Sequence, residues 1–118
     1  MGSLPEIDLS KAMEAVDGDS ELLKELVAMF IDDYPRQMEE IQNAIEEKNS
    51  DCLTRTAHSL KGAVGNFGAK KQYDLAYQLE MIGKEERMND AIEAYYQLEN
   101  EMESLGQYFS TPEWEQNL

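Results

Sequence analysis

The chain has 118 residues and a net charge of −15, from 25 acidic and 10 basic residues. Because so acidic a protein is repelled by nucleic-acid phosphates and by anionic membranes, we expect neither as a partner. The length suits a single domain, and the hydrophobic content of 42% is typical of a chain that folds around a core.

Cysteine and histidine are too scarce for a metal site of the usual kinds. The single Cys52 excludes an internal disulfide and a cysteine-rich site, and the sequence has only one histidine. We therefore predict that the chain itself binds no metal and no other cofactor. No signal peptide and no apolar run long enough to cross a bilayer is recognised, which favours a cytoplasmic location.

The composition, rich in Glu, Gln, Ala, Leu and Met and without β-branched runs, predicts helix almost throughout. Asp8 is expected to be the N-cap of a short helix that ends near Val16, before Gly18. Asp19 is expected to be the N-cap of the next helix. The apolar stripe of that helix is predicted to be Leu22, Leu23, Leu26 and Phe30.

Pro35 has no backbone N–H, so it is expected to kink this second helix or to restart it. Its apolar face then continues with Met38, Ile41 and Ile45. Asn49 or Ser50 is expected to begin a third helix, which ends near Gly65 and Gly68. The buried stripe of the third helix is predicted to be Leu53, Ala57, Leu60, Val64 and Phe67.

The apolar periodicity predicts two further helices. A fourth ends after Gly83, and its stripe is Leu75, Ala76, Leu79 and Ile82. Asn89 is expected to be the N-cap of a last long helix, whose stripe is Ile92, Tyr95, Leu98, Met102 and Leu105. The sequence Ser110-Thr111-Pro112 is expected to end this helix and to leave a tail that contains Trp114.

Several long amphipathic helices joined by short loops predict an all-α fold. We expect an antiparallel four-helix bundle with a short additional N-terminal helix. Residues 8–109 are assigned to the bundle, and residues 110–118 to a C-terminal tail. Residues 1–7 are assigned to an N-terminal extension, which begins with a Met-Gly-Ser sequence typical of an expression remnant.

The negative charge is distributed unevenly along the chain. Residues 52–73 contain no acid and carry +4, whereas the other 96 residues hold all 25 acids and 6 bases, which gives −19. The bases of this window are Arg55, Lys61, Lys70 and Lys71, and its centre holds the only histidine, His58. A solvated charged face is the ordinary explanation of such a run, but the coincidence with the sole histidine indicates a functional site.

A helical projection places His58 and Gly62 on one exposed face of the third helix, opposite the predicted apolar stripe. Lys61 is three residues from His58 and can reach the same patch. A glycine beside an exposed histidine leaves room for a partner, whereas Gly65 fits partner approach and close helix packing equally well.

The turn between the third and fourth helices indicates a partner for the histidine. With Ala69 as its centre, His58 lies eleven residues before the turn and Glu80 eleven residues after it. In an antiparallel pair these residues lie at the same height, so Glu80 could accept a hydrogen bond from Nδ1–H of His58. Nε2 would then keep a free lone pair. A solvent-exposed glutamate is the alternative.

These residues carry a resemblance to a known family. The run from Ala57 to Ala63, the Asn-Phe-Gly-Ala sequence that starts at Asn66, and the Leu-Glu pair at Leu79 resemble the signature of histidine phosphotransfer (HPt) domains of two-component phosphorelays. The resemblance extends over most of the chain. It implies a four-helix bundle with an exposed phosphoaccepting histidine, without kinase activity of its own.

The resemblance also implies roles for individual residues. His58 matches the phosphoaccepting histidine, Lys61 the basic residue beside the phosphoryl group, and Glu80 the residue that hydrogen-bonds the histidine ring. Gly62 matches the small residue that lets the partner approach. We expect the partner-binding surface to include this glycine and the neighbouring residues Arg55, Gly65, Lys70 and Lys71.

The implied partners are receiver domains of response regulators and a sensor or hybrid histidine kinase. Mg²⁺ is then supplied by the receiver, and the chain is expected to be a monomer. Two alternatives stay open. One is an acidic helical adaptor without chemistry, presenting Tyr73, Tyr77, Tyr96 and Trp114 as exposed aromatic residues. The other is the phosphorylatable domain of a chemotaxis-type kinase.

Overall fold

The computed structural model describes residues 7–118, which form five α-helices and two short 3₁₀ helices. The helices are α1 (Leu9–Ala15), α2 (Ser20–Glu46), α3 (Ser50–Asn66), α4 (Lys70–Lys84) and α5 (Ala91–Phe109). The 3₁₀ helix η1 (Met88–Asp90) precedes α5, and η2 (Pro112–Asn117) follows it.

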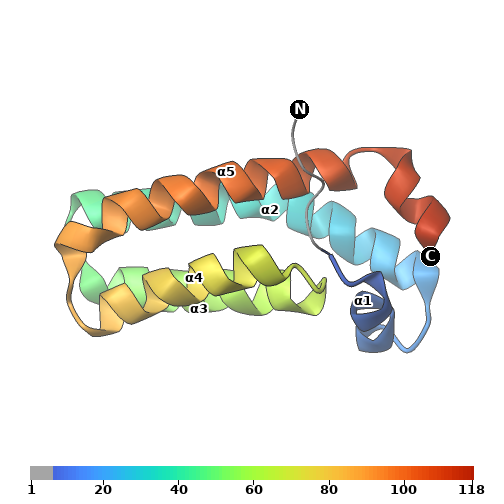
Figure 1. Ribbon diagram of the computed structural model, residues 1–118, viewed down its shortest axis with the longest axis horizontal. Coiled ribbons are helices and arrows are strands. Elements are labelled where there is room, and N and C mark those ends of the chain that lie inside the picture. Colours follow the sequence, from blue (N-terminus) through green and yellow to red (C-terminus); the bar gives the residue numbers. More distant parts are fainter. Residues whose placement is uncertain (1–6) are drawn as a thin grey trace.

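The four long helices form two layers. Figure 1 shows α2 beside α5 in one layer, α3 beside α4 in the other, and α1 near one end. From α2 to α5, helices that follow one another along the chain run in opposite directions. The predicted all-α fold, a four-helix bundle with one additional short helix, is confirmed.

Side-chain caps determine where three of the helices begin. Asp8, Asp19 and Asn49 each accept hydrogen bonds from backbone N–H groups of the following turn at 3.0 to 3.3 Å. Such caps satisfy donors that have no partner within the helix. The prediction for Asn89 is wrong, because this residue lies inside η1, which runs directly into α5.

The predicted apolar stripes of α3 and of the second half of α2 are buried as expected. In the first half of α2 the prediction is partly wrong, since Leu23 and Phe30 are buried but Leu22 and Leu26 remain exposed. The neighbours Leu22 and Leu23 point in different directions from the helix, so only one of them can face the core. This part of α2 also extends beyond the α3–α4 layer (Figure 1), which leaves one side of it uncovered. Ile92 is also exposed, because Ala91 and other residues take the buried side of α5.

Pro35 lies inside α2, which continues without a restart from Ser20 to Glu46. The residue is exposed, so the backbone carbonyl that lacks an N–H partner there can be hydrated. Buried side chains before and after it, Phe30 and Met38, hold both halves of the helix against the bundle.

Trp114 is buried, so its prediction as an exposed aromatic residue is wrong. Its indole N–H donates to the carbonyl oxygen of Phe109 at 3.0 Å, and the two rings meet edge to face. The aromatic contacts continue from Phe109 to Phe67 and on to Phe30. The end of the chain therefore closes the bundle at the α3–α4 turn.

The α3–α4 turn is bound to the segment before α1. Gly68 has φ +68°, and its carbonyl oxygen accepts a hydrogen bond from the backbone N–H of Asp8 at 3.0 Å. Ile7 and Ala69 form a single antiparallel bridge beside this contact. The end of the α3–α4 hairpin is thus held from outside the bundle.

Substitution by alanine is expected to have opposite effects on stability at two glycines of this hairpin. A Cβ on Gly83 would lie 3.1 Å from the Ser50 carbonyl oxygen and closer still to Thr54 Oγ1, whereas a Cβ on Gly62 would meet nothing within 4 Å. We expect Gly83→Ala to lower the free energy of unfolding by about 1–3 kcal/mol through overpacking. Gly62→Ala is expected to raise it by about 0.5–1 kcal/mol through helix propensity. Urea denaturation checks both, and equal effects would contradict the described packing.

Candidate functional site

The imidazole of His58 projects from the middle of α3 into solvent, and its side chain is 65% exposed. The buried stripe of α3 leaves this face free, as the helical projection predicted. One ring nitrogen is nevertheless held, because Nδ1 lies 3.0 Å from Oε2 of Glu80 on α4. The side chain is therefore accessible and oriented at the same time.

Glu80 is almost fully buried, with a side chain only 3% exposed. It binds three cationic or N–H groups: Nδ1 of His58 at 3.0 Å, Nζ of Lys61 at 2.7 Å and Nζ of Lys84 at 3.3 Å. The alternative of a solvent-exposed glutamate is wrong. The predicted contact with His58 is present, since α3 and α4 pair antiparallel around the turn.

The electrostatics of this cluster keep Glu80 ionised. Burial acts to raise the pKa of Glu80, but the hydrogen bonds from Lys61, His58 and Lys84 outweigh burial and leave the pKa below its usual value. An ionised carboxylate can only accept, so Nδ1 of His58 carries the proton. In a neutral ring Nε2 then has the free lone pair, at the exposed edge of the side chain.

Lys61 lies in a covered position beside the carboxylate. Its side chain is 17% exposed, and the hydrogen bond to Glu80 raises its pKa above the usual value. Its ammonium also lies 4.9 Å from the ring centre of Tyr77 and 5.9 Å from that of Tyr73. The sequence predicted the position of Lys61 near His58 but not these aromatic contacts.

Lys84 is a site residue that the sequence reasoning missed. It follows Glu80 by four residues on α4, a spacing that allows an ion pair on any helix and could have been noticed. With Lys61 it places two positive charges on one carboxylate, so the cluster is net positive. Arg55, one turn before His58, lines a hollow together with Lys84.

The two glycines of α3 serve different purposes. Gly62 is exposed, and open space lies above it next to His58. At Gly65 a Cβ would lie 3.1 Å from the ring of Tyr73, which makes this glycine a site of close packing between α3 and α4. Of the two interpretations of Gly65, the structure therefore favours packing.

Lys70 and Lys71 are not brought to His58. They begin α4, ten and nine residues before Glu80 respectively, a separation of about 15 Å along the helix axis. Lys70 pairs with Asp74 at 3.1 Å, and Lys71 pairs with Glu101 of α5 at 3.2 Å. The positive window of the sequence is thus divided into a cluster around Glu80 and a separate pair at the hairpin end.

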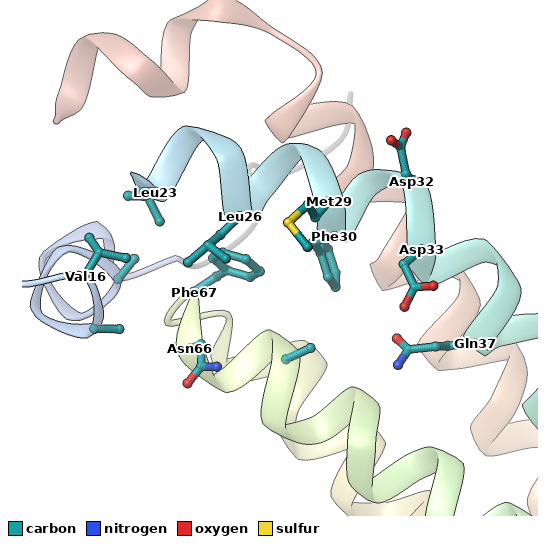
Figure 2. Close-up of a pocket in the computed structure, with 13 residues that line it drawn as sticks. Val16, Leu23, Leu26, Met29, Phe30, Asp32, Asp33, Gln37, Asn66 and Phe67 are labelled. Carbon is teal, nitrogen blue, oxygen red and sulfur yellow. The ribbon is translucent and has the colours of Figure 1, made fainter. Parts of the chain in front are cut away.

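A largely apolar hollow of about 600 Å³ lies beside α3 on the side of α2 (Figure 2). Leu26 and Met29 reach over it from α2, Asn66 lines its α3 side, and Asp33 lies at its rim. Met29 is 65% exposed. Lysine and arginine are missing from its described lining, so the hollow offers an apolar contact surface and not a phosphate site.

Within residues 7–118 no group of three or more His, Cys, Asp or Glu side chains is arranged to hold a metal ion. In the same part of the chain, no helix combines the length and the hydropathy that a membrane span needs.

Comparison with known proteins identifies the family. The sequence profile of the Hpt domain matches residues 25–108, which is well over half of the chain. A search of curated proteins found no match.

Two solved structures have the same fold. Histidine-containing phosphotransfer protein B (HptB) from Pseudomonas aeruginosa PAO1 superimposes with a TM-score of 0.85 and 22% sequence identity, over 98% of this chain and 99% of that one. The HPT domain of the Hpt sensor hybrid histidine kinase from Shewanella gives a TM-score of 0.77 and 21% identity, over 88% of this chain and 90% of that one. The chain belongs to the Hpt domain family and has a histidine phosphotransfer function in a two-component phosphorelay.

Proposed function

We propose that His58 accepts a phosphoryl group on Nε2 from the phosphorylated aspartate of a receiver domain and passes it to a second receiver. One observation carries this assignment: the only histidine of the chain is 65% exposed, while its Nδ1 is held at 3.0 Å by the buried Glu80. An exposed ring whose proton position is fixed has a free nucleophilic nitrogen at its outer edge.

The transfer step balances without a further reactant. The lone pair of Nε2 of His58 attacks the phosphorus atom, a P–N bond forms, and the P–O bond to the aspartate breaks. The electron pair of that bond leaves with the aspartate carboxylate. Nδ1 keeps its proton and shares the positive charge that develops on the ring with Glu80, which lies 3.0 Å away. The onward transfer is the reverse of this step on another receiver.

Lys61 and Lys84 supply positive charge where the phosphoryl oxygens gather. Both ammonium groups bind the carboxylate that also binds Nδ1 of His58, so one carboxylate group separates each of them from the ring. Phosphoryl transfer depends mainly on positioning and on charge stabilisation. We assign Lys61 and Lys84 this electrostatic role, and Glu80 the orientation of the ring.

The remaining components of the reaction come from partner proteins. Mg²⁺ is supplied by the receiver domain, and the phosphoryl group originates in a sensor or hybrid histidine kinase, because this chain has no kinase activity of its own. The chain acts in the cytoplasm as a monomer. Its single exposed histidine and compact bundle suit one-to-one contact with each receiver in turn.

The receiver covers the open face at Gly62 and extends onto the apolar hollow between α2 and α3. Asn66 of that hollow follows His58 by eight residues on the same helix, about 12 Å along its axis. Apolar surface next to a polar reaction site is typical of a protein-binding surface.

Met29→Glu tests this docking surface. We expect the variant to slow transfer from the receiver about tenfold or more, because it places a charge in an apolar contact. Thermal unfolding should be unchanged, since Met29 is exposed. Tyr96→Glu, which alters an exposed aromatic residue on α5, is the matched control and should transfer normally. Equal transfer rates in the two variants would exclude the hollow from the receiver interface.

A phosphotransfer assay tests the proposed function. A receiver domain, phosphorylated with labelled phosphate, is mixed with this chain in the presence of Mg²⁺, and a second receiver is then added. We expect label to appear on the chain and then to leave it for the second receiver. The proposal would be contradicted if no receiver of a panel transferred label to the chain, or if ATP labelled the chain in the absence of a kinase.

A further inference from the structure

Two tyrosines of α4 enclose the ammonium group of Lys61. Tyr73 and Tyr77 are four residues apart, so they project from the same face of the helix. The ammonium nitrogen lies 4.9 Å from the ring centre of Tyr77 and 5.9 Å from that of Tyr73. Both distances are within the range in which a cation is attracted by an aromatic face.

The two rings are held differently. The ring of Tyr73 lies against Gly65, where a Cβ would approach it to 3.1 Å, so the glycine admits this ring to the surface of α3. Tyr77 is 46% exposed and lies one turn nearer to Glu80 along α4. The side chain of Lys61 is only 17% exposed, because the two rings and Glu80 surround it.

The enclosure has a chemical consequence. A lysine ammonium has three N–H donors, and Oε1 of Glu80, at 2.7 Å, takes one of them. The aromatic faces attract the positive charge, but they do not take up an N–H donor by a hydrogen bond as a carboxylate does. The ammonium is therefore held in place while donors remain for another acceptor.

We propose that Tyr77, supported by Tyr73, is a positioning residue for phosphoryl transfer. It holds the ammonium of Lys61 at the edge of the His58 ring, so that its free N–H groups meet the phosphoryl oxygens on Nε2. The inference depends on the proposed role of His58. Without the ring of Tyr77, the ammonium group of Lys61 becomes hydrated and more mobile. The transition state then loses a positive charge that is held in a fixed position.

The first test is spectroscopic and independent of activity. A lysine side chain that lies over an aromatic ring has methylene proton resonances shifted upfield by the ring current. We expect this shift for Lys61 in the wild-type protein and in Tyr77→Phe, and a clear reduction of it in Tyr77→Leu, in which only the more distant ring of Tyr73 remains. Tyr96→Leu, a matched change on α5, should leave the resonances of Lys61 in place.

The second test is a double-mutant cycle with the rate of transfer from a phosphorylated receiver. Tyr77→Leu should slow transfer about tenfold, in keeping with the strength of a partly desolvated cation–π contact. Tyr77→Phe should keep nearly the wild-type rate. In a Lys61→Met background, Tyr77→Leu should cause no further loss, because the residue that it positions is absent.

Two outcomes would overturn the inference. One is a wild-type rate for Tyr77→Leu. The other is an equal loss from Tyr77→Leu in the wild-type and the Lys61→Met backgrounds of this cycle, which would indicate that Tyr77 contacts the receiver or supports the fold. Failure of the proposed function would differ from both, since the wild-type protein itself would then take no label.

Discussion

The His58→Gln variant is expected to take no phosphoryl label from any receiver that labels the wild-type protein. Glutamine has a similar length, but its amide nitrogen is not nucleophilic, and the chain has no second histidine. The loss should therefore reach the detection limit, which in a labelling assay is about a hundredfold or more. The measurement is the amount of label on the chain after mixing with the phosphorylated receiver.

The fold of this variant should be unchanged, because the His58 side chain is 65% exposed and its hydrogen bond to Glu80 lies at the surface end of the pair. Loss of that bond costs about 1 kcal/mol of unfolding free energy. Ser59→Ala is a matched control, since it removes an exposed hydroxyl group from the neighbouring position of α3. Label that persists in His58→Gln and disappears in Ser59→Ala would place the phosphoryl group on the serine.

Removal of Glu80 is expected to have the second-largest effect, on stability and on transfer together. Glu80→Ala leaves Lys61 covered without its counter-ion and Nδ1 of His58 without an acceptor. Breaking a buried pair is costly, but Lys84 is half exposed and can be hydrated. We expect a loss of about 2–3 kcal/mol in the free energy of unfolding at neutral pH, measured by urea denaturation.

The effect of Glu80 on stability depends on pH with a defined sign. Because the folded protein holds the pKa of Glu80 below the usual value of 4.5, its stabilising contribution is complete above the pKa of the unfolded chain. It is lost as the pH falls through the lower pKa of the folded state. The stability difference between the wild-type protein and Glu80→Ala should therefore narrow in acid.

Glu85→Gln is the control, since the ion pair of Glu85 with Arg87 is exposed to solvent. Its stability should follow that of the wild-type protein throughout the titration. A difference between wild type and Glu80→Ala that stays constant down to about pH 3 would contradict an ionised, stabilising Glu80.

Local signals predicted most of the bundle. The caps at Asp8, Asp19 and Asn49 and the stripe of α3 depend on neighbours in the sequence, so their periodicity and spacing are sufficient. The burial of Trp114 could not be read in the same way. It depends on η2 turning back toward Phe109, a contact that only the tertiary fold creates.

The site was predictable where it followed from the antiparallel pairing of two helices. The equal distance of His58 and Glu80 from Ala69 was enough to predict their contact. The degree of burial of Glu80 was not predictable, because it depends on how closely the side chains of α3 and α4 pack around it in the folded bundle. The aromatic faces over Lys61 also required knowledge of how α3 packs on α4.

The most direct test of the central claim is NMR spectroscopy of the ¹⁵N-labelled wild-type chain after transfer from a phosphorylated receiver. Long-range ¹H–¹⁵N correlations of the His58 ring show which nitrogen bears the phosphoryl group. The account predicts a phosphoryl group on Nε2 and a proton retained on Nδ1, beside Glu80. A phosphoryl group on Nδ1, or on any residue other than His58, would contradict it.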